Sequence, residues 1–70
     1  MMPLSMVNEG EPQVIRKVGG EEETRKFLEN LGFVQGATVT VVSEISGNMI
    51  VNVKDSRVAI GKDMANRIMV

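Results

Sequence analysis

The stretch TVTVVSEISGNMIVNVK, residues 38–54, decides the fold of this chain. Its two halves are rich in β-branched side chains that alternate with polar ones, and Ser46, Gly47 and Asn48 separate them. This alternation is typical of half-buried strands, and a short break of small polar residues between two such runs indicates a hairpin. We therefore predict two antiparallel strands, at 38–45 and 49–54.

The register of this hairpin depends on the length of its loop. A two-residue Gly-Asn turn would place Val41 opposite Lys54, which mixes apolar and charged side chains on one face. A three-residue Ser-Gly-Asn loop, with its Asn in the left-handed conformation, pairs Val41 with Val53 and Ile45 with Met49. We expect the second register, because it gathers one apolar inner set: Val39, Val41, Ile45, Met49, Val51 and Val53.

Shorter elements are expected on both sides of the hairpin. We predict a first strand around Val14–Val18, enclosed by Pro12 and a Gly-Gly pair, a fourth strand at Arg57–Ile60 and a fifth at Ile68–Val70. Asp63 is expected to cap a single helical turn before the last strand. Leu4 and Val7 are expected to hold the N-terminal lead-in against the core. Five short strands in a chain of this size suit a small curled barrel, whose closure hides strand edges.

One helix is expected, at Glu21–Leu31. Glu21 with Arg25 and Glu22 with Lys26 form i,i+4 pairs in the favoured order, and the apolar stripe consists of Phe27, Leu28 and Leu31. Gly32 is expected to end the helix in a left-handed conformation. Leu28 and Phe33 then occupy the two positions that make the hydrophobic contact of a Schellman motif.

Composition excludes several classes of function. The chain has 70 residues with 8 Lys+Arg, 9 Asp+Glu and a formal net charge of -1, which fits a single domain over residues 1–70. It contains no Cys and no His. Disulfides, thiolate nucleophiles and the most common general base are therefore absent, and we expect no enzymatic activity. The first nine residues lack the basic and apolar regions of a secretory signal, so we expect a cytoplasmic location. No apolar run reaches the length of about 18 residues that a membrane-spanning helix needs.

Two segments, LGFVQGATVTVV at 31–42 and RVAIGKDMANRIMV at 57–70, resemble the FeoA family of small cytoplasmic proteins associated with bacterial ferrous-iron transport. The similarity covers essentially the whole chain, including PLSMV at 3–7. It implies an SH3-like barrel, and as partner the FeoB-type membrane iron permease, which has a GTP-binding domain. It implies no catalytic residue. This chain departs from the family at Gln35, where Pro is common, and at 60–65, where the family often has Leu-Arg-x-x-Glu-Ala.

A similar domain occurs at the C-terminus of DtxR-like metal-dependent repressors. The resemblance therefore leaves an alternative open, a free-standing regulatory module that binds a peptide or a transcription factor. None of the arginines is singled out by its surroundings as an arginine finger for a GTPase partner.

Metal and cofactor sites are not expected. The hard ligands are the scattered carboxylates of Glu21, Glu22, Glu23, Asp55 and Asp63, and consecutive glutamates on a helix point in different directions. An iron carrier is therefore disfavoured, and no cofactor is predicted. Among the methionines, we expect Met49 and Met64 to fill gaps in the core, and Met6 and Met69 to be available as adaptable contacts.

Nucleic-acid binding is also not expected, because such sites combine a basic groove with stacking aromatic side chains. Phe27 and Phe33 are the only aromatic residues, and both are assigned to helix packing. Protein contact remains. In the expected register Val42 and Ile50 are diagonal neighbours on the polar face of the hairpin, which makes them candidates for a partner site. Val34, in the loop after the helix, is a third candidate. The competing interpretation is that a strongly bent strand buries both of its faces in turn.

Overall fold

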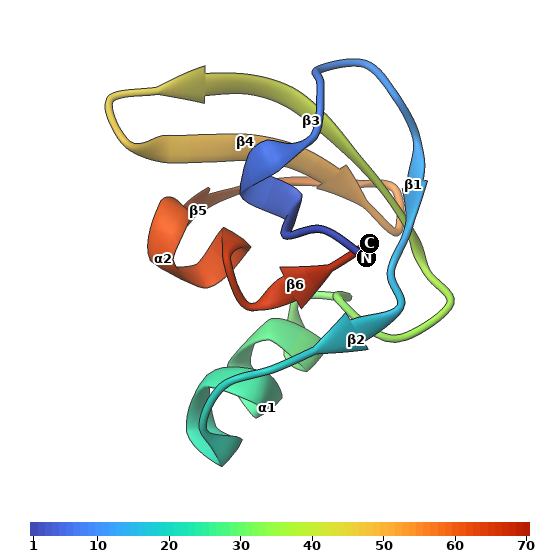
Figure 1. Ribbon diagram of the computed structural model, residues 1–70, viewed down its shortest axis with the longest axis vertical. Helices are drawn as coiled ribbons and strands as arrows, with labels where there is room; N and C mark the ends of the chain where they lie inside the picture. The colour runs from blue at the N-terminus through green and yellow to red at the C-terminus, as the bar shows by residue number, and fades with distance from the viewer.

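The computed structural model describes residues 1–70 and is mainly β, with one main helix (Figure 1). The elements in chain order are η1 (Leu4–Met6), β1 (Gln13–Val14), β2 (Lys17–Val18), α1 (Glu22–Asn30), β3 (Thr38–Ile45), β4 (Asn48–Val53), β5 (Ser56–Gly61), α2 (Lys62–Ala65) and β6 (Ile68–Met69). One antiparallel sheet has the order β1-β3-β4-β5, and a second pairs β2 with β6. The predicted fold class is confirmed, with six strands where the sequence predicts five.

The additional strand arises because the predicted first strand is split into β1 and β2, one for each sheet. Between them, Ile15 donates its N–H to the carbonyl of Ala37 at 2.9 Å and accepts from the N–H of Gly36 at 2.8 Å. The next residue, Arg16, donates to the carbonyl of Met69 at 2.8 Å. The backbone thus passes from one sheet to the other within two residues, and this crossing joins the two sheets into a curled barrel.

The chain termini pair with each other. Met2 and Val70 exchange two backbone hydrogen bonds, at 3.0 and 2.9 Å, and Pro3 forms a bridge with Met69. Figure 1 shows the two ends side by side at the centre of the molecule. This pairing directs Leu4 into the interior, where it is fully buried, and Val7 packs against the same core. The predicted anchoring of the lead-in is confirmed.

A single hydrophobic core fills the barrel. It consists of 13 residues: Leu4, Ile15, Leu28, Phe33, Val39, Val41, Met49, Val51, Val53, Ile60, Ala65, Ile68 and Val70. Five of the six residues predicted for the inner face of the hairpin belong to it. Ile45 does not, because its side chain is 60% exposed. Met64 packs against the core, so Met49 and Met64 fill the interior as predicted.

The predicted hairpin register is wrong, because the turn has two residues where three are predicted and because a β-bulge follows further along β3. The turn consists of Ser46 and Gly47, both with positive φ, and it pairs Ile45 with Asn48. Further along, Val41 pairs with Val51, and Val42 is the extra residue of the bulge. The extra residue shifts the alternation of β3 by one position. The valines near the start of β3 therefore face inward, while Ile45 beyond the bulge faces outward.

The end of α1 forms the predicted Schellman motif. Phe33 donates its N–H to the carbonyl of Leu28 at 3.0 Å, and Gly32 donates to Glu29 at 2.9 Å. Leu28 and Phe33 are both fully buried. Phe27, predicted for the same stripe, is 51% exposed, because the helix turns only a narrow face toward the core.

The charged groups at the helix starts follow the predictions only in part. On α1, Lys26 and Glu22 form the expected ion pair at 3.1 Å, whereas Glu21 and Arg25 form none. The predicted cap by Asp63 is wrong. The N-cap of α2 is Gly61, and Asp63 lies inside the first turn. Since β5 continues directly into α2, no loop remains in which Asp63 could precede the helix.

Replacing Gly32 with alanine should destabilise the fold by about 1–3 kcal/mol, because Gly32 has a φ of 108°. An added Cβ would also lie 3.4 Å from the side chain of Lys54. Gly19→Ala is the matched control, since Gly19 has no positive φ and its added Cβ would contact only the Arg67 carbonyl oxygen at 3.7 Å. Urea unfolding of both variants measures the difference. An equal loss of stability in the two would contradict a special role for Gly32.

Candidate docking face

The outer face of the β3–β4–β5 sheet carries two kinds of side chain in adjacent cross-strand rows. Residues directly opposite each other in an antiparallel sheet share a face, so the register assigns the rows. The first row is polar and the second largely apolar. The polar row consists of Thr40, Asn52 and Arg57, and the largely apolar row consists of Val42, Ser43, Ile50 and Ala59.

Val42 and Ile50 lie closer together than the sequence predicts. The register passes from Val41–Val51 to Ser43–Ile50, so both Val42 and Ser43 oppose Ile50 at the bulge. Val42 and Ile50 are each partly exposed, and neither is among the apolar residues that pack against the core. The structure therefore brings these two candidates together on the outer face of the sheet.

Val34 lies apart from this pair. It is partly exposed and belongs to the tight loop between α1 and β3, where its carbonyl accepts from the N–H of Ala37 at 3.0 Å. Val42 lies four positions after Thr38, the residue that follows that loop, which is a distance of about 13 Å along an extended strand. The three candidate residues thus do not form one cluster.

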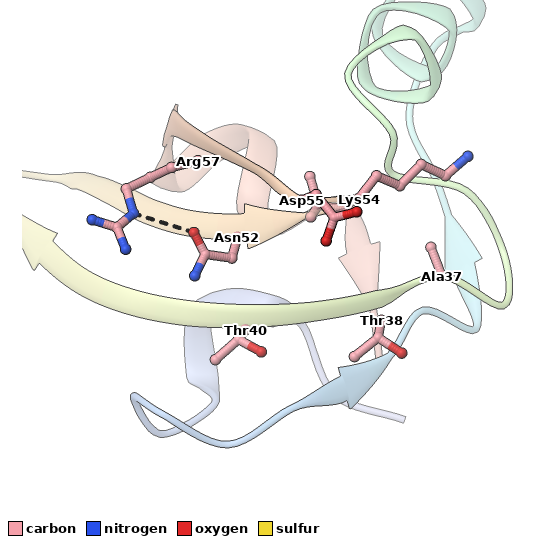
Figure 2. Close-up of a pocket in the computed structure, with 8 residues that line it drawn as sticks. Ala37, Thr38, Thr40, Asn52, Lys54, Asp55 and Arg57 are labelled. Carbon is pink, nitrogen blue, oxygen red and sulfur yellow. Dashed lines mark hydrogen bonds between the residues drawn. The ribbon is translucent and has the colours of Figure 1, made fainter.

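An open polar groove of about 610 Å³ lies beside the apolar row. Figure 2 shows its lining side chains, which come from the loop before β3, from β3, β4 and β5, and from the β4–β5 turn: Ala37, Thr38, Thr40, Asn52, Val53, Lys54, Asp55 and Arg57. The Nε of Arg57 donates to the Oδ1 of Asn52 at 3.2 Å, and this bond holds the guanidinium across the sheet. The groove therefore offers a positioned cation with hydroxyl and amide groups around it.

The two cations of this groove are unpaired within the protein. The ion pairs present are Lys26–Glu22 and Lys62–Glu44, and neither includes Arg57 or Lys54. The sequence pattern does not single out Arg57. Only a prediction of the two-residue turn at Lys54 and Asp55 could have identified it. Counting back from that turn places Asn52 opposite Arg57, as the structure shows.

No metal-binding arrangement is present: no group of three or more His, Cys, Asp or Glu side chains is placed to hold an ion. No helix has the length and apolar character needed to cross a membrane.

Comparison with known proteins agrees with the resemblance noted in the sequence. The FeoA domain, as a family, matches residues 2–70. This chain belongs to the FeoA family. It is 31% identical over 70 residues to a protein of Methanocaldococcus jannaschii that is named as an Fe(2+) transport protein A. The match covers 100% of this chain and 85% of the relative.

Solved structures of FeoA proteins share the fold. An iron uptake regulatory protein (FeoA) superimposes with a TM-score of 0.90 at 33% identity, over 99% of this chain and 93% of the other. FeoA of Stenotrophomonas maltophilia, solved with zinc, has a TM-score of 0.87 at 26% identity and covers 100% and 89%. It is described as a procaryotic SH3 domain protein and put forward as a ferrous iron transport activating factor. A manganese-dependent transcriptional repressor, 16% identical, shares the fold with a TM-score of 0.84 over 94% of this chain and 38% of its own.

Proposed function

We propose that this FeoA protein is a cytoplasmic accessory protein of ferrous-iron uptake that docks on a FeoB-type GTP-binding membrane permease. The observation that supports it most is the family match over residues 2–70, together with relatives named for Fe(2+) transport and for its activation. The FeoA family consists of accessory proteins of transport, and membership in it also supports a non-enzymatic role.

Under this proposal the protein acts by differential binding. A domain that catalyses nothing can alter a partner only by binding one of its states more tightly than another. For a GTP-binding permease, the nucleotide state provides the two states. We propose that the FeoA protein prefers one of them and thereby supports or regulates transport.

We propose that Val42 and Ile50 form the centre of the contact. Both are partly exposed, both lie outside the core, and they oppose each other on one face. A small apolar centre within a polar surround is the arrangement in which buried contacts contribute most of the binding energy. Val34 is proposed as a separate contact, because it lies in the loop between α1 and β3, away from this pair.

The test is an affinity pull-down with tagged protein from detergent-solubilised membranes of the native host, with GDP and with a non-hydrolysable GTP analogue. We expect recovery of the permease, in an amount that depends on the nucleotide. The double variant Val42→Ser, Ile50→Ser should weaken recovery by roughly tenfold or more. Val34→Ser tests the second contact in the same assay.

The matched control is Phe27→Ser, which removes an exposed apolar side chain from α1, away from the sheet face (Figure 1). It should leave recovery unchanged. Full recovery with a folded Val42/Ile50 double variant would exclude these residues as the contact. Recovery of soluble transcription regulators alone would replace the proposal by the regulatory module.

A further inference from the structure

β5 is an edge strand, since it is the last in the order β1-β3-β4-β5. The turn that joins it to β4 consists of Lys54 and Asp55, with φ values of 48° and 64°, and it brings Val53 opposite Ser56. A two-residue turn of this kind closes on a hydrogen-bonded pair, and such pairs alternate along an antiparallel ladder. Hence Arg57 and Ala59 point their backbone N–H and C=O groups away from β4.

These backbone groups have no partner in the fold. None of the backbone hydrogen bonds outside the regular ladders involves Arg57 or Ala59, and both residues are exposed. The free edge is short, because α2 begins at Lys62 directly after β5. An extended segment of only a few residues would fit against it.

The side chains beside this edge indicate what such a segment would contain. A residue placed opposite Ala59 would lie on the outer face, where the small methyl group leaves the neighbouring Ile50 within reach. A residue opposite Arg57 would lie beside an arginine whose guanidinium bonds to Asn52 on β4 and has no acidic partner, so its side chain must reach across β5 to pair with it. An apolar side chain suits the first position and a carboxylate suits the second.

We propose that the free edge of β5 binds an extended acidic segment of the partner as an added strand. In it, an Asp or Glu faces Arg57 and a large apolar residue, two positions away, covers Ala59 and contacts Ile50. This mode combines backbone hydrogen bonds for affinity with alternate side chains for specificity. The identity of the partner rests on the proposed function, whereas the chemistry of the segment rests on β5 itself.

The first test uses a defined probe, the peptide acetyl-Thr-Leu-Thr-Glu-Thr-Leu-Thr-amide, which has the required spacing in either direction. Amide hydrogen exchange of the full chain is followed by NMR as the peptide is added. We expect the amides of Arg57 and Ala59 to become protected tenfold or more at saturation, while those of Ser56, Val58 and Ile60 are protected from the start. A peptide with Gln for Glu should bind roughly fivefold more weakly.

Three results would overturn the proposal. One is no binding at millimolar peptide, another is binding without protection of the Ala59 amide, and the third is equal binding of the Gln peptide. The other candidate for binding to this edge is a second copy of the same chain. Sedimentation of the free protein as a dimer that Ala59→Pro dissociates would replace the partner segment by a second copy of this chain.

Ala59→Pro is the decisive variant, because proline removes the outward N–H and no ladder hydrogen bond is lost at this position. We expect it to fold and to lose peptide binding at least tenfold, with Ala59→Ser as the matched control that retains binding. If the proline variant does not fold, Ala59→Asp replaces it, since a carboxylate there repels the acidic segment. If Ala59→Pro recovers the permease normally, the proposed binding at the β5 edge is wrong and the proposed function stands. If the wild-type protein does not recover the permease, only the proposed function is contradicted.

Discussion

Phe33→Ala is expected to cost about 3–5 kcal/mol of folding free energy. Phe33 is fully buried and belongs to the single core, and its backbone N–H bonds to the Leu28 carbonyl at the end of α1. A domain of this size is stable by only about 4–10 kcal/mol, so the loss removes a large share of the available stability. Urea unfolding followed by circular dichroism measures it.

Phe27→Ala is the matched control, because it makes the same chemical change six positions earlier at a side chain that is 51% exposed. We expect a loss below about 1 kcal/mol. Equal destabilisation by the two changes would contradict the assignment of one phenylalanine to the core and the other to the surface.

The second large effect is expected at a residue close to the chain end. Leu4→Ala should cost about 2–5 kcal/mol, although terminal segments normally tolerate substitution. Leu4 is fully buried, and the pairing of Met2 with Val70 and of Pro3 with Met69 holds it in place. Thermal and urea unfolding should both detect the change.

Met6→Ala provides the control within the same 3-10 turn, since Met6 is 67% exposed. Its replacement should be nearly neutral. A neutral Leu4→Ala would mean that the lead-in is dispensable and that the core closes without it. A large effect would show that the N-terminal turn is part of the barrel.

Local chemistry accounts for the parts of the fold that the sequence predicts well. The Schellman ending at Gly32 depends on residues within one helical turn, so residue type and spacing are enough to predict it correctly. The inner sets of β3 before the bulge and of β4 follow from strict alternation, which has the same meaning in any sheet. These features are encoded by neighbours in the chain and can therefore be inferred from the sequence.

The residues of the candidate docking face can be predicted from the sequence, and its geometry cannot. Alternation alone is enough to name Val42 and Ile50, yet the structure places them directly opposite each other because of the bulge. The groove around Arg57 and the free edge of β5 do not follow from the sequence pattern. Both depend on the choice of Lys54 and Asp55 as the turn. Asp is a common turn residue that tolerates positive φ, but Lys54 has no such preference.

Residue type, alternation and a single glycine are sufficient for the mainly β class, the one helix with its end, and most of the core. Tertiary structure alone decided the hairpin register, the bulge at Val42, the split of the first strand and the exposure of Phe27. The physical reason is that a curled barrel must close. Closure requires a segment whose two halves pair with different sheets and a bulge that bends β3. It also determines which face of each element packs against the core.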